Sequence, residues 1–271
     1  MRWTPGSVSS NVEDRRGSGT GMKLGVGGTI VMLALSLLFG RNLLPDDTGG
    51  SQAGAPVKDS PEEQKKLQFA SFVLDDTQNV WRGQLKGYRD AKMVLFTDST
   101  RSGCGTGEAA MGPFYCPTDE KVYIDLGFFE ALQRKLGAEG DFAQAYVIAH
   151  EIGHHVQHQL GLDEKMRARV RQNPSAENAL SIAHELQADC FAGVWGHSTK
   201  NRGLLEAGDI EEGLNAASAV GDDRIQKKSG GRVNPETWTH GSAAQRTEWF
   251  KRGLVGGNPE SCDTSSTLSQ R

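Results

Sequence analysis

An H-E-x-x-H sequence at residues 150–154 restricts what this chain can fold into more than any other feature. A helix places residues four positions apart on one face, so His150 and His154 can bind one metal ion together. Glu151 lies one step around the helix, beside that ion, where its carboxylate can take a proton from water. Residues 143–149 are mostly apolar, which predicts a buried helix rather than an exposed polar one.

A catalytic zinc site needs a third protein ligand and an open position for water. A histidine six residues after His154 would complete an extended three-histidine pattern, but that position is Leu160. A second helix, predicted over residues 176–195, carries Glu185 and Asp189 four positions apart. One of these carboxylates can bind zinc while the other accepts the second imidazole N–H of a ligand histidine. The ligand candidates are therefore His158, His184, Glu185 and Asp189, with His184 weaker, and we expect His155 and His158 at the surface or around the ligands.

Longer stretches of the chain resemble one family, the bacterial neutral zinc metallopeptidases with a single N-terminal membrane segment and a Glu-liganded zincin site. The matching stretches are Gly-Pro-Phe-Tyr-Cys-Pro at 112–117, Ala-Gln-Ala-Tyr-Val-Ile-Ala-His-Glu at 143–151, Glu-Leu-Gln-Ala-Asp-Cys-Phe-Ala-Gly at 185–193, Gly-Asp-Asp at 221–223 and Thr-His-Gly-Ser at 239–242. The likeness covers residues 61–262. It implies a zincin-like α+β domain, mostly helical with a small sheet, that binds one Zn²⁺ per chain. It also implies His150, His154 and Glu185 as zinc ligands, Glu151 as the catalytic residue and Asp189 as the residue that orients a ligand histidine.

Zinc hydrolysis of a peptide bond needs a donor for the tetrahedral oxyanion in addition to the metal. His240, in a loop before a predicted helix, is the first choice, and Tyr115 and Tyr146 are rivals. A peptide substrate commonly pairs with the edge of a small sheet, and the predicted strand at residues 122–126 is the expected partner. We also expect the glycine-rich residues 102–112 to border the cleft, and Asp222 and Asp223 to lie on a helix surface.

Two functions of different classes remain open. The chain is either a membrane-anchored zinc endopeptidase acting on a protein or peptide, or a catalytically silent, zinc-stabilised envelope domain that binds partner proteins. Glu151 favours the first, because a structural zinc site needs no general base beside its ligands. Hydrolysis of another amide, such as a peptidoglycan cross-link, is a weaker third possibility.

An uncharged, strongly apolar stretch at residues 24–40 lies between Lys23 and Arg41. Its seventeen residues would span roughly 25 Å as a helix, the short end of what crosses a bilayer. We predict a transmembrane anchor over residues 22–41, with a cleavable signal peptide as the alternative. The excess of basic residues before it predicts a single-pass protein of the bacterial inner membrane, with its N-terminus in the cytoplasm and its catalytic domain periplasmic or extracellular.

The rest of the chain divides by composition. We predict a disordered cytoplasmic segment over residues 1–21, a flexible linker over 42–59, the metallopeptidase domain over 60–262 and a polar tail over 263–271. Within the domain we expect a helix capped by Ser60, strands at 92–97 and 122–126, and helices opened by Asp141, by Asp209 and by Ser242. With 30 basic and 34 acidic side chains the net charge is −4, which argues against nucleic-acid binding.

All four cysteines follow the apolar stretch, and none forms a C-x-x-C pair. An oxidising space outside the cytoplasm would allow two disulfides, for which three pairings exist. We favour Cys104–Cys116, closing a glycine-rich loop, and Cys190–Cys262, tying back the C-terminal segment. Four free buried thiols are the alternative.

Overall fold

The computed structural model describes residues 1–16, 60–230 and 232–265. The predicted anchor (22–41), the predicted linker (42–59) and residues 266–271 of the predicted tail lie outside this part of the chain. No helix among the described residues has the length and apolar character needed to cross a membrane.

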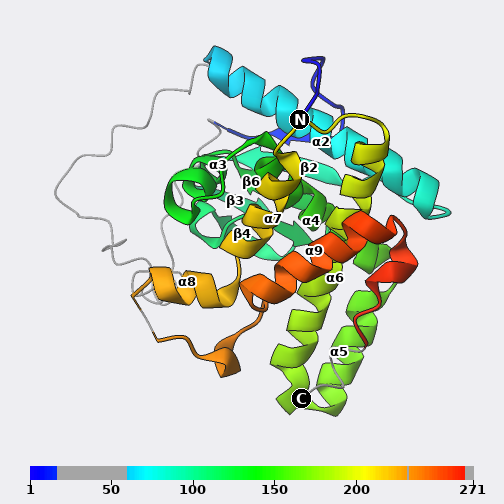
Figure 1. The fold of residues 1–271 in the computed structure, drawn as a ribbon, viewed down its shortest axis with the longest axis vertical. Coiled ribbons are helices and arrows are strands. Elements are labelled where there is room, and N and C mark those ends of the chain that lie inside the picture. The colour runs from blue at the N-terminus through cyan, green and yellow to red at the C-terminus, as the bar shows by residue number, and fades with distance from the viewer. Residues whose placement is uncertain (17–59, 231, 266–271) are drawn as a thin grey trace.

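The described chain forms small sheets surrounded by helices, an α+β arrangement that is mostly helical (Figure 1). The main sheet has the order β1-β2-β6-β5, in which β1, β2 and β6 are parallel and β5 is antiparallel to β6. Its strands are β1 (Val12–Asp14), β2 (Lys92–Phe96), β6 (Lys121–Asp125) and β5 (Phe114–Cys116). A separate antiparallel hairpin pairs β3 (Ser99–Ser102) with β4 (Gly105–Glu108).

The sheet topology corrects the expected substrate-pairing strand. Residues 122–126 fall largely in β6, which is hydrogen-bonded on both sides, to β2 and to β5. A strand in the middle of a sheet has no free backbone groups to offer a peptide. The edges of the described sheet are β1 and β5, and β5, a three-residue strand that periodicity does not reveal, is the edge that borders the cleft.

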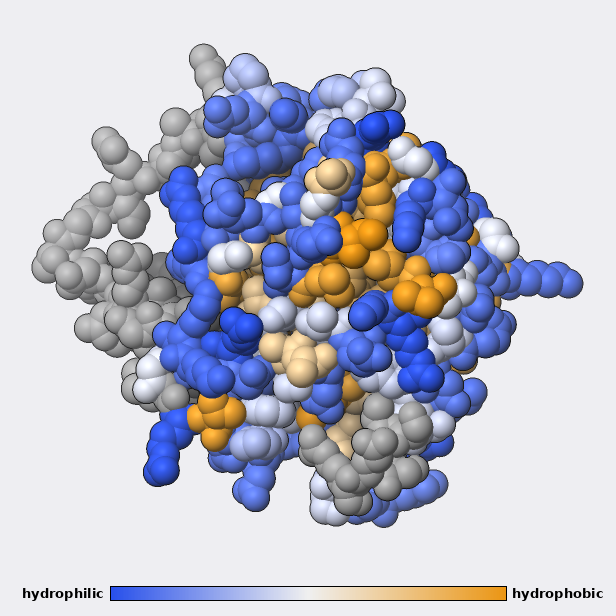
Figure 2. Space-filling model, viewed as in Figure 1, coloured by the Kyte–Doolittle hydropathy of each residue, from blue (hydrophilic) through white to orange (hydrophobic). Residues whose placement is uncertain are grey.

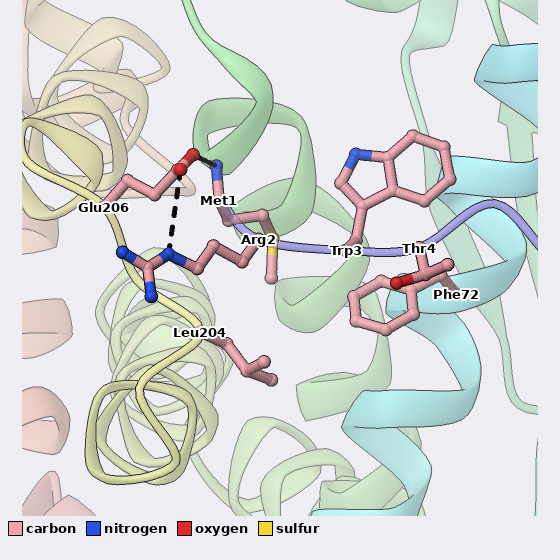
Figure 3. Close-up of a pocket in the computed structure, with 7 residues that line it drawn as sticks. All are labelled: Met1, Arg2, Trp3, Thr4, Phe72, Leu204 and Glu206. Carbon is pink, nitrogen blue, oxygen red and sulfur yellow. Dashed lines mark ion pairs between the residues drawn. The ribbon is translucent and has the colours of Figure 1, made fainter.

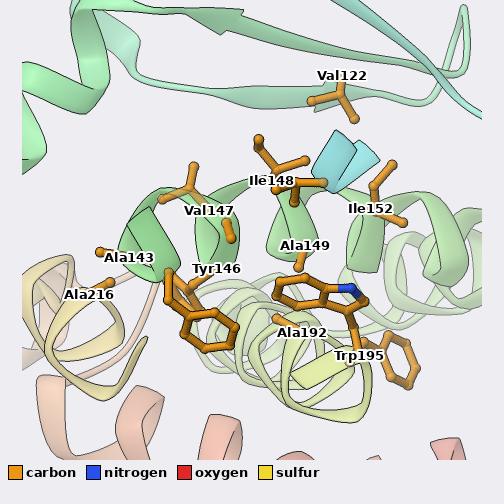
Figure 4. Close-up of a cluster of buried hydrophobic side chains, with 14 of the residues drawn as sticks. Val122, Ala143, Tyr146, Val147, Ile148, Ala149, Ile152, Ala192, Trp195 and Ala216 are labelled. Carbon is orange, nitrogen blue, oxygen red and sulfur yellow. The ribbon is translucent and has the colours of Figure 1, made fainter. Parts of the chain in front are cut away.

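Helix α4 (Asp141–Gln159), which carries the H-E-x-x-H sequence, lies between the sheet and helix α6 (Glu177–Asn201). Figure 4 shows Ile148 and Ile152 pointing toward Val122 of the sheet, while Ala149 faces Trp195 of α6. All five of these side chains are buried. The apolar residues before His150 thus form the centre of the core, as their pattern predicts.

The remaining helices enclose this core: α2 (Pro61–Gln84), α3 (Gly127–Ala131) with a π-helical turn at Leu132–Leu136, α5 (Leu162–Gln172), α7 (Asp209–Ala219), α8 (Asp222–Lys228) and α9 (Ala243–Gly256). Ser60 caps α2, and Ser242 forms a reciprocal capping box with Gln245 on α9, both as expected. Helices α4 and α7 begin at Asp141 and Asp209, but neither aspartate is the cap, because a glycine precedes each helix. Helix α5 was not predicted; its apolar stripe consists of only three residues, Leu162, Met166 and Val170, which are half-buried. On the face seen in Figure 1, hydrophilic residues cover most of the surface (Figure 2).

The prediction of disorder over residues 1–21 is wrong for residues 1–16. Val12–Asp14 forms β1 and pairs with β2, and Trp3 packs edge-on against Phe69 of α2 with the ring centroids 5.3 Å apart. The glycine-, serine- and arginine-rich composition suggested disorder, but the fold supplies a sheet edge and an aromatic surface that composition does not show. Residues 17–21 lie outside the described chain.

Both favoured disulfides are present, and they account for all four cysteines. Cys104–Cys116 joins the turn of the β3–β4 hairpin to β5. Cys190–Cys262 joins α6 to the 3-10 turn Pro259–Cys262 that follows α9. The two bonds brace elements on either side of α4.

Glycines allow three helices to approach one another closely. A Cβ atom on Gly153 of α4 would lie 2.9 Å from the carbonyl oxygen of Ala188 on α6. Between α6 and α9, a Cβ on Gly253 would lie 1.9 Å from the carbonyl oxygen of Cys190, and one on Gly193 would lie 2.1 Å from that of Phe250. Real Cβ atoms do not come so close to backbone, so these glycines set the spacing of α4, α6 and α9.

Replacing Gly153 with alanine should therefore destabilise the protein, by roughly 1–3 kcal/mol, because two backbones must separate. Gly83→Ala is the matched control, since Gly83 lies in α2 and a Cβ there would meet nothing within 4 Å. That change should be neutral or stabilising by up to about 1 kcal/mol. Urea unfolding of both variants measures the difference, and equal stability would show that the α4–α6 spacing does not depend on this glycine.

Candidate metal centre

Three side chains from α4 and α6 converge on one point. The Nε2 atom of His150 lies 3.3 Å from one carboxylate oxygen of Glu185, and the Nε2 atom of His154 lies 3.4 Å from the other. The possible ligand atoms of all three residues lie within 4.8 Å of one another. The structure therefore brings together His150, His154 and Glu185, the three residues that the family resemblance implies as zinc ligands.

This donor set fits zinc. Two imidazole nitrogens and one carboxylate are a known catalytic zinc set, with bonds of about 2.0–2.2 Å. A tetrahedral ion with such bonds holds its ligand atoms roughly 3.3–3.5 Å apart. The contacts of Glu185 with His150 and His154 match that separation, and a set of three protein ligands leaves a fourth position open.

Each histidine is oriented through its other ring nitrogen. The Nδ1 atom of His150 lies 2.8 Å from a carboxylate oxygen of Asp189, and Nδ1 of His154 lies 2.8 Å from Oε1 of Gln157. Gln157 in turn donates to the carbonyl oxygen of His184 on α6. These contacts favour the tautomer in which both Nε2 atoms are free to bind a metal. Asp189 makes the contact expected of it, whereas Gln157 was not expected.

Asp189 is itself held by a buried cation that the sequence did not reveal. Arg246 of α9 donates to its carboxylate from Nε at 2.8 Å and from Nη2 at 2.9 Å. Tyr146 of α4 also donates its hydroxyl proton to Asp189. Burial raises the pKa of Asp189, but Arg246 and His150 outweigh burial and lower it, so the carboxylate is ionised. No local signal could identify Arg246, because its partner lies 57 residues away.

Glu151 lies beside the ligands with only 7% of its surface exposed. Burial raises the pKa of this carboxyl to about 7, although the charges of His150 and Arg246 act in the opposite direction. The backbone of Tyr115 on β5 also favours the ionised form and acts to lower this pKa. A group that exchanges a proton near neutral pH suits general base and general acid catalysis.

His240 lines the same cleft, as expected, and its partner is Asp222. One oxygen of Asp222 accepts the backbone N–H groups of Thr239, His240 and Gly241, at 2.9, 2.8 and 3.0 Å. Its other oxygen lies 3.1 Å from Nδ1 of His240 and raises the pKa of that imidazole. The expectation that Asp222 is only part of a helix surface is therefore wrong: this carboxylate shapes the loop that presents His240.

Asp223, the neighbour of Asp222, also has a local partner. Its carboxylate accepts the backbone N–H of Ala243, the first residue of α9, at 2.7 Å. Asp223 therefore also helps to fix the start of the helix that carries Arg246.

The two rival oxyanion donors have other partners. Tyr146 is buried and donates to Asp189. The Tyr115 hydroxyl lies 2.9 Å from Nδ1 of His155. His155 is fully buried, which rules out the surface position among the two expected for it, and its Nε2 atom contacts the carbonyl oxygen of Arg89 at 2.7 Å. Of the three candidates, His240 is the one whose ring is half exposed at the cleft.

The weaker ligand candidates form a separate group. His158 and His184 each lie 3.1 Å from a carboxylate oxygen of Asp163 at the start of α5. The ring of His184 also stacks on that of His154, with centroids 5.5 Å apart. This arrangement places His184 behind a ligand histidine rather than among the ligands.

The metal centre opens into a cleft of about 1300 Å³. The residues before and within β5, from Gly112 to Tyr115, form one wall, and parts of α3, α5 and α8 form others. Residues 109–112, in the glycine-rich stretch, do border this cleft as expected. The volume exceeds that of typical small-molecule pockets and suits a chain such as a peptide.

A second group of carboxylates lies at another place, where α4 and α7 begin. Asp141, Asp209 and Glu212 approach one another, but this group already has a cation. The amino group of Met1 lies 2.5 Å from Asp141 and 3.3 Å from Asp209. Glu212 accepts the backbone N–H of Phe142.

Comparison with known proteins identifies the family. The family model described as "Putative neutral zinc metallopeptidase" matches residues 1–265. The chain belongs to the neutral zinc metallopeptidase family. It is 48% identical to "Uncharacterized protein YpfJ" of Escherichia coli K12, over 97% of this chain and 98% of that protein. It is also 46% identical to "Uncharacterized protein Rv2575" of Mycobacterium tuberculosis H37Rv, over 69% of this chain and 66% of that protein. No solved structure matches the chain.

Family membership supports zinc as the metal, and the geometry makes its ligands testable. Glu185→Ala should lower bound zinc from about one per chain to far less, because it removes one of three ligands. His184→Ala is the matched control: the neighbouring residue on α6 contacts Asp163, so the variant should keep its zinc. Metal analysis after dialysis measures both. A zinc-free His184→Ala protein beside a zinc-replete Glu185→Ala protein would contradict this ligand set.

Proposed function

We propose that this protein is a zinc-dependent peptidase in which His150, His154 and Glu185 bind the metal and Glu151 is the general base. The observation that carries the proposal is the position of Glu151. Its carboxylate lies in the cleft beside the ligands, but it is not one of the three residues whose atoms converge. A site built only to hold a structural metal has no need of this buried carboxylate.

The chain's own residues supply the proton transfers. Zinc, when bound, supplies Lewis-acid chemistry that polarises a carbonyl group and acidifies a water molecule. Glu151 accepts the proton of the attacking water and then delivers it to the leaving amine. Burial raises the pKa of the Glu151 carboxyl to about 7, so this group can both accept and deliver a proton near neutral pH. With a cation held by the three ligands, Glu151 would be more readily ionised and so ready to accept a proton at the start of the reaction.

His240 is placed to stabilise negative charge that develops on the substrate. Asp222 favours the protonated imidazole and fixes the loop that carries it. The ring is half exposed at the cleft, so a substrate oxygen can reach its other N–H. A positive donor held in place before the reaction lowers the barrier because no reorganisation is needed during the step.

Strand β5 is the element on which a peptide substrate would align. It is an edge strand of the described sheet, and its residues Phe114 and Tyr115 border the cleft that also holds Glu151. A peptide that adds to this edge gains backbone hydrogen bonds independent of its sequence. Such binding would place its carbonyl groups along the wall of the cleft that carries the general base.

The general base is tested by Glu151→Gln, which keeps size and polarity but cannot accept a proton. Peptide hydrolysis should fall by at least about 10²-fold, because general base catalysis is worth roughly 10² to 10⁴ in rate. Zinc content should stay unchanged. The assay is cleavage of a mixed peptide library, with a chelator as the control for metal dependence.

Asp189→Asn is the comparison for Glu151→Gln, because it should affect metal binding rather than proton transfer. Loss of the Asp189 carboxylate should loosen His150 and weaken zinc binding by about 10- to 100-fold. Excess zinc should restore much of its activity and none of the activity of Glu151→Gln. Wild-type turnover by zinc-loaded Glu151→Gln would refute the mechanism. Absence of metal-dependent cleavage by the wild type would favour a zinc-stabilised domain that binds partner proteins.

Removing the proposed oxyanion donor with His240→Ala should lower kcat by about 10²- to 10³-fold. KM should change much less, since the interaction forms in the transition state. Tyr115→Phe should have a smaller effect, because its hydroxyl is engaged with His155. Steady-state kinetics of both variants separate the candidates, and a larger loss in Tyr115→Phe would transfer the role to the tyrosine.

A further inference from the structure

The cleft that holds the metal centre has an apolar lining on one side. Val147 lies about one turn before His150 on α4, and Val220, at the end of α7, accepts a hydrogen bond from Arg246 through its carbonyl oxygen. Three half-buried side chains extend this lining: Phe128 of α3, Leu136 of the π-helical turn and Ile225 of α8. On this side, the space beside the ligands therefore suits an apolar side chain of a substrate.

Helix α8 leads along the same side of the cleft. At its start, Asp222 holds the loop that carries His240. Ile225 and Lys228, three positions apart and so on one face of the helix, both line the cleft. Between Asp222 and Lys228 the helix rises about 9 Å, which is the length of about three residues of an extended peptide. A peptide bound in the cleft can therefore reach Lys228 with its second or third residue from the bond beside His240.

Two lysines lie side by side at this point. Lys135 is in the last turn of the π-helical segment, and Lys228 is the last residue of α8. The ammonium group of Lys228 donates to the carbonyl oxygen of Lys135 at 2.8 Å. Both side chains line the cleft, and both are exposed. Within the described part of the chain, neither lysine has a carboxylate partner.

The carboxylates that line the cleft do not balance these charges. Glu185 belongs to the ligand set, and Glu151 is buried beside it. Asp163 already contacts two histidines. Arg167 of α5 adds a further positive charge to the lining. An anionic group that reaches Lys135 and Lys228 therefore meets two cations without a competing carboxylate.

Another pocket, beside the N-terminal arm, shows the opposite arrangement. It has a volume of about 490 Å³, and its charged groups are already paired. Figure 3 shows the amino group of Met1 and the side chain of Arg2 directed at Glu206, at 3.5 and 3.8 Å. The two lysines of the cleft lack such a partner, which makes the cleft the place where a ligand would supply the negative charge.

We propose that the cleft selects peptides with a large apolar side chain next to the cleaved bond and a carboxylate two or three residues from that bond, bound by Lys135 and Lys228. This inference rests on the proposed peptidase function and specifies its substrate class. The carboxylate is an acidic side chain or the free C-terminus of a peptide, because both present the same group to an ammonium ion.

Peptide binding to the zinc-loaded full chain carrying Glu151→Gln tests this class without cleavage. Three end-capped peptides with a neutral fluorophore share a central leucine and carry glutamate, glutamine or lysine at the second and third positions on both sides. Either direction of the bound peptide then presents these side chains to the lysines. Fluorescence anisotropy should give a Kd for the glutamate peptide about 3- to 10-fold lower than for the glutamine peptide. The lysine peptide should bind more weakly than both.

Two further peptides test the apolar side chain and the source of the carboxylate. Replacing the central leucine of the glutamate peptide with glycine should raise Kd by at least about 10-fold, because the apolar lining loses its contact. A glutamine peptide with a free C-terminus three residues after the leucine separates the two sources. Tight binding of this peptide assigns the carboxylate to a chain end, and tight binding of the glutamate peptide alone assigns it to an acidic side chain.

Charge reversal in the protein tests the lysines themselves. Adding Lys228→Glu should reverse the preference, so that the lysine peptide binds more tightly than the glutamate peptide. Lys227→Glu is the matched control, because Lys227 is the exposed neighbour on α8 and does not line the cleft. That variant should keep the original preference. Equal binding of the three capped peptides, no binding of any of them, or an unchanged preference after Lys228→Glu would overturn the proposal.

The same peptides separate this inference from the peptidase function. Binding with the expected preference, but no cleavage by the zinc-loaded wild type, would refute the peptidase activity and leave the binding class in place. Cleavage by the wild type without any preference for glutamate over lysine would refute the substrate class and leave the peptidase activity in place.

Discussion

The buried contact between Asp189 and Arg246 is the interaction on which the rest of the site depends. Asp189 is fully buried, and a buried carboxylate is tolerated only with charged and hydrogen-bonded partners. Arg246 provides two N–H groups, and His150 completes the set through Nδ1. The same carboxylate therefore joins α4, α6 and α9 and turns the other nitrogen of His150 toward Glu185.

Close packing of the helix backbones and one disulfide hold the helices that carry this network in place. Gly153 allows α4 to approach α6, Gly193 and Gly253 allow α6 to approach α9, and the Cys190–Cys262 bond ties the end of the chain to the middle of α6. Ligand atoms that must converge to within a few tenths of an ångström need such rigid supports. The opposite wall of the cleft is less regular: the short strand β5 and the loop held by Asp222 carry the groups that we propose contact a substrate.

The sequence predicted the parts of the structure that depend on local patterns. Helical spacing put His150 and His154 on one face of α4 and Glu185 and Asp189 on one face of α6, and the family resemblance implied Glu185 as the third ligand. The sequence missed Arg246 and the role of Asp222, whose partners are distant in the chain. It also mistook the central strand β6 for an edge, and the N-terminal arm for disorder, because strand order and a docking surface are properties of the folded chain. The predicted membrane segment lies outside the described residues and stays a prediction.

Anomalous diffraction at the zinc edge from crystals of the zinc-loaded protein tests the central claim most directly. The account predicts one peak bound by Nε2 of His150, Nε2 of His154 and the carboxylate of Glu185, with Asp189 against the ring of His150 and Glu151 outside the ligand set. A peak at the His184–Asp163 group, or at the carboxylates of Asp141 and Asp209, with none between His150 and His154, would contradict it.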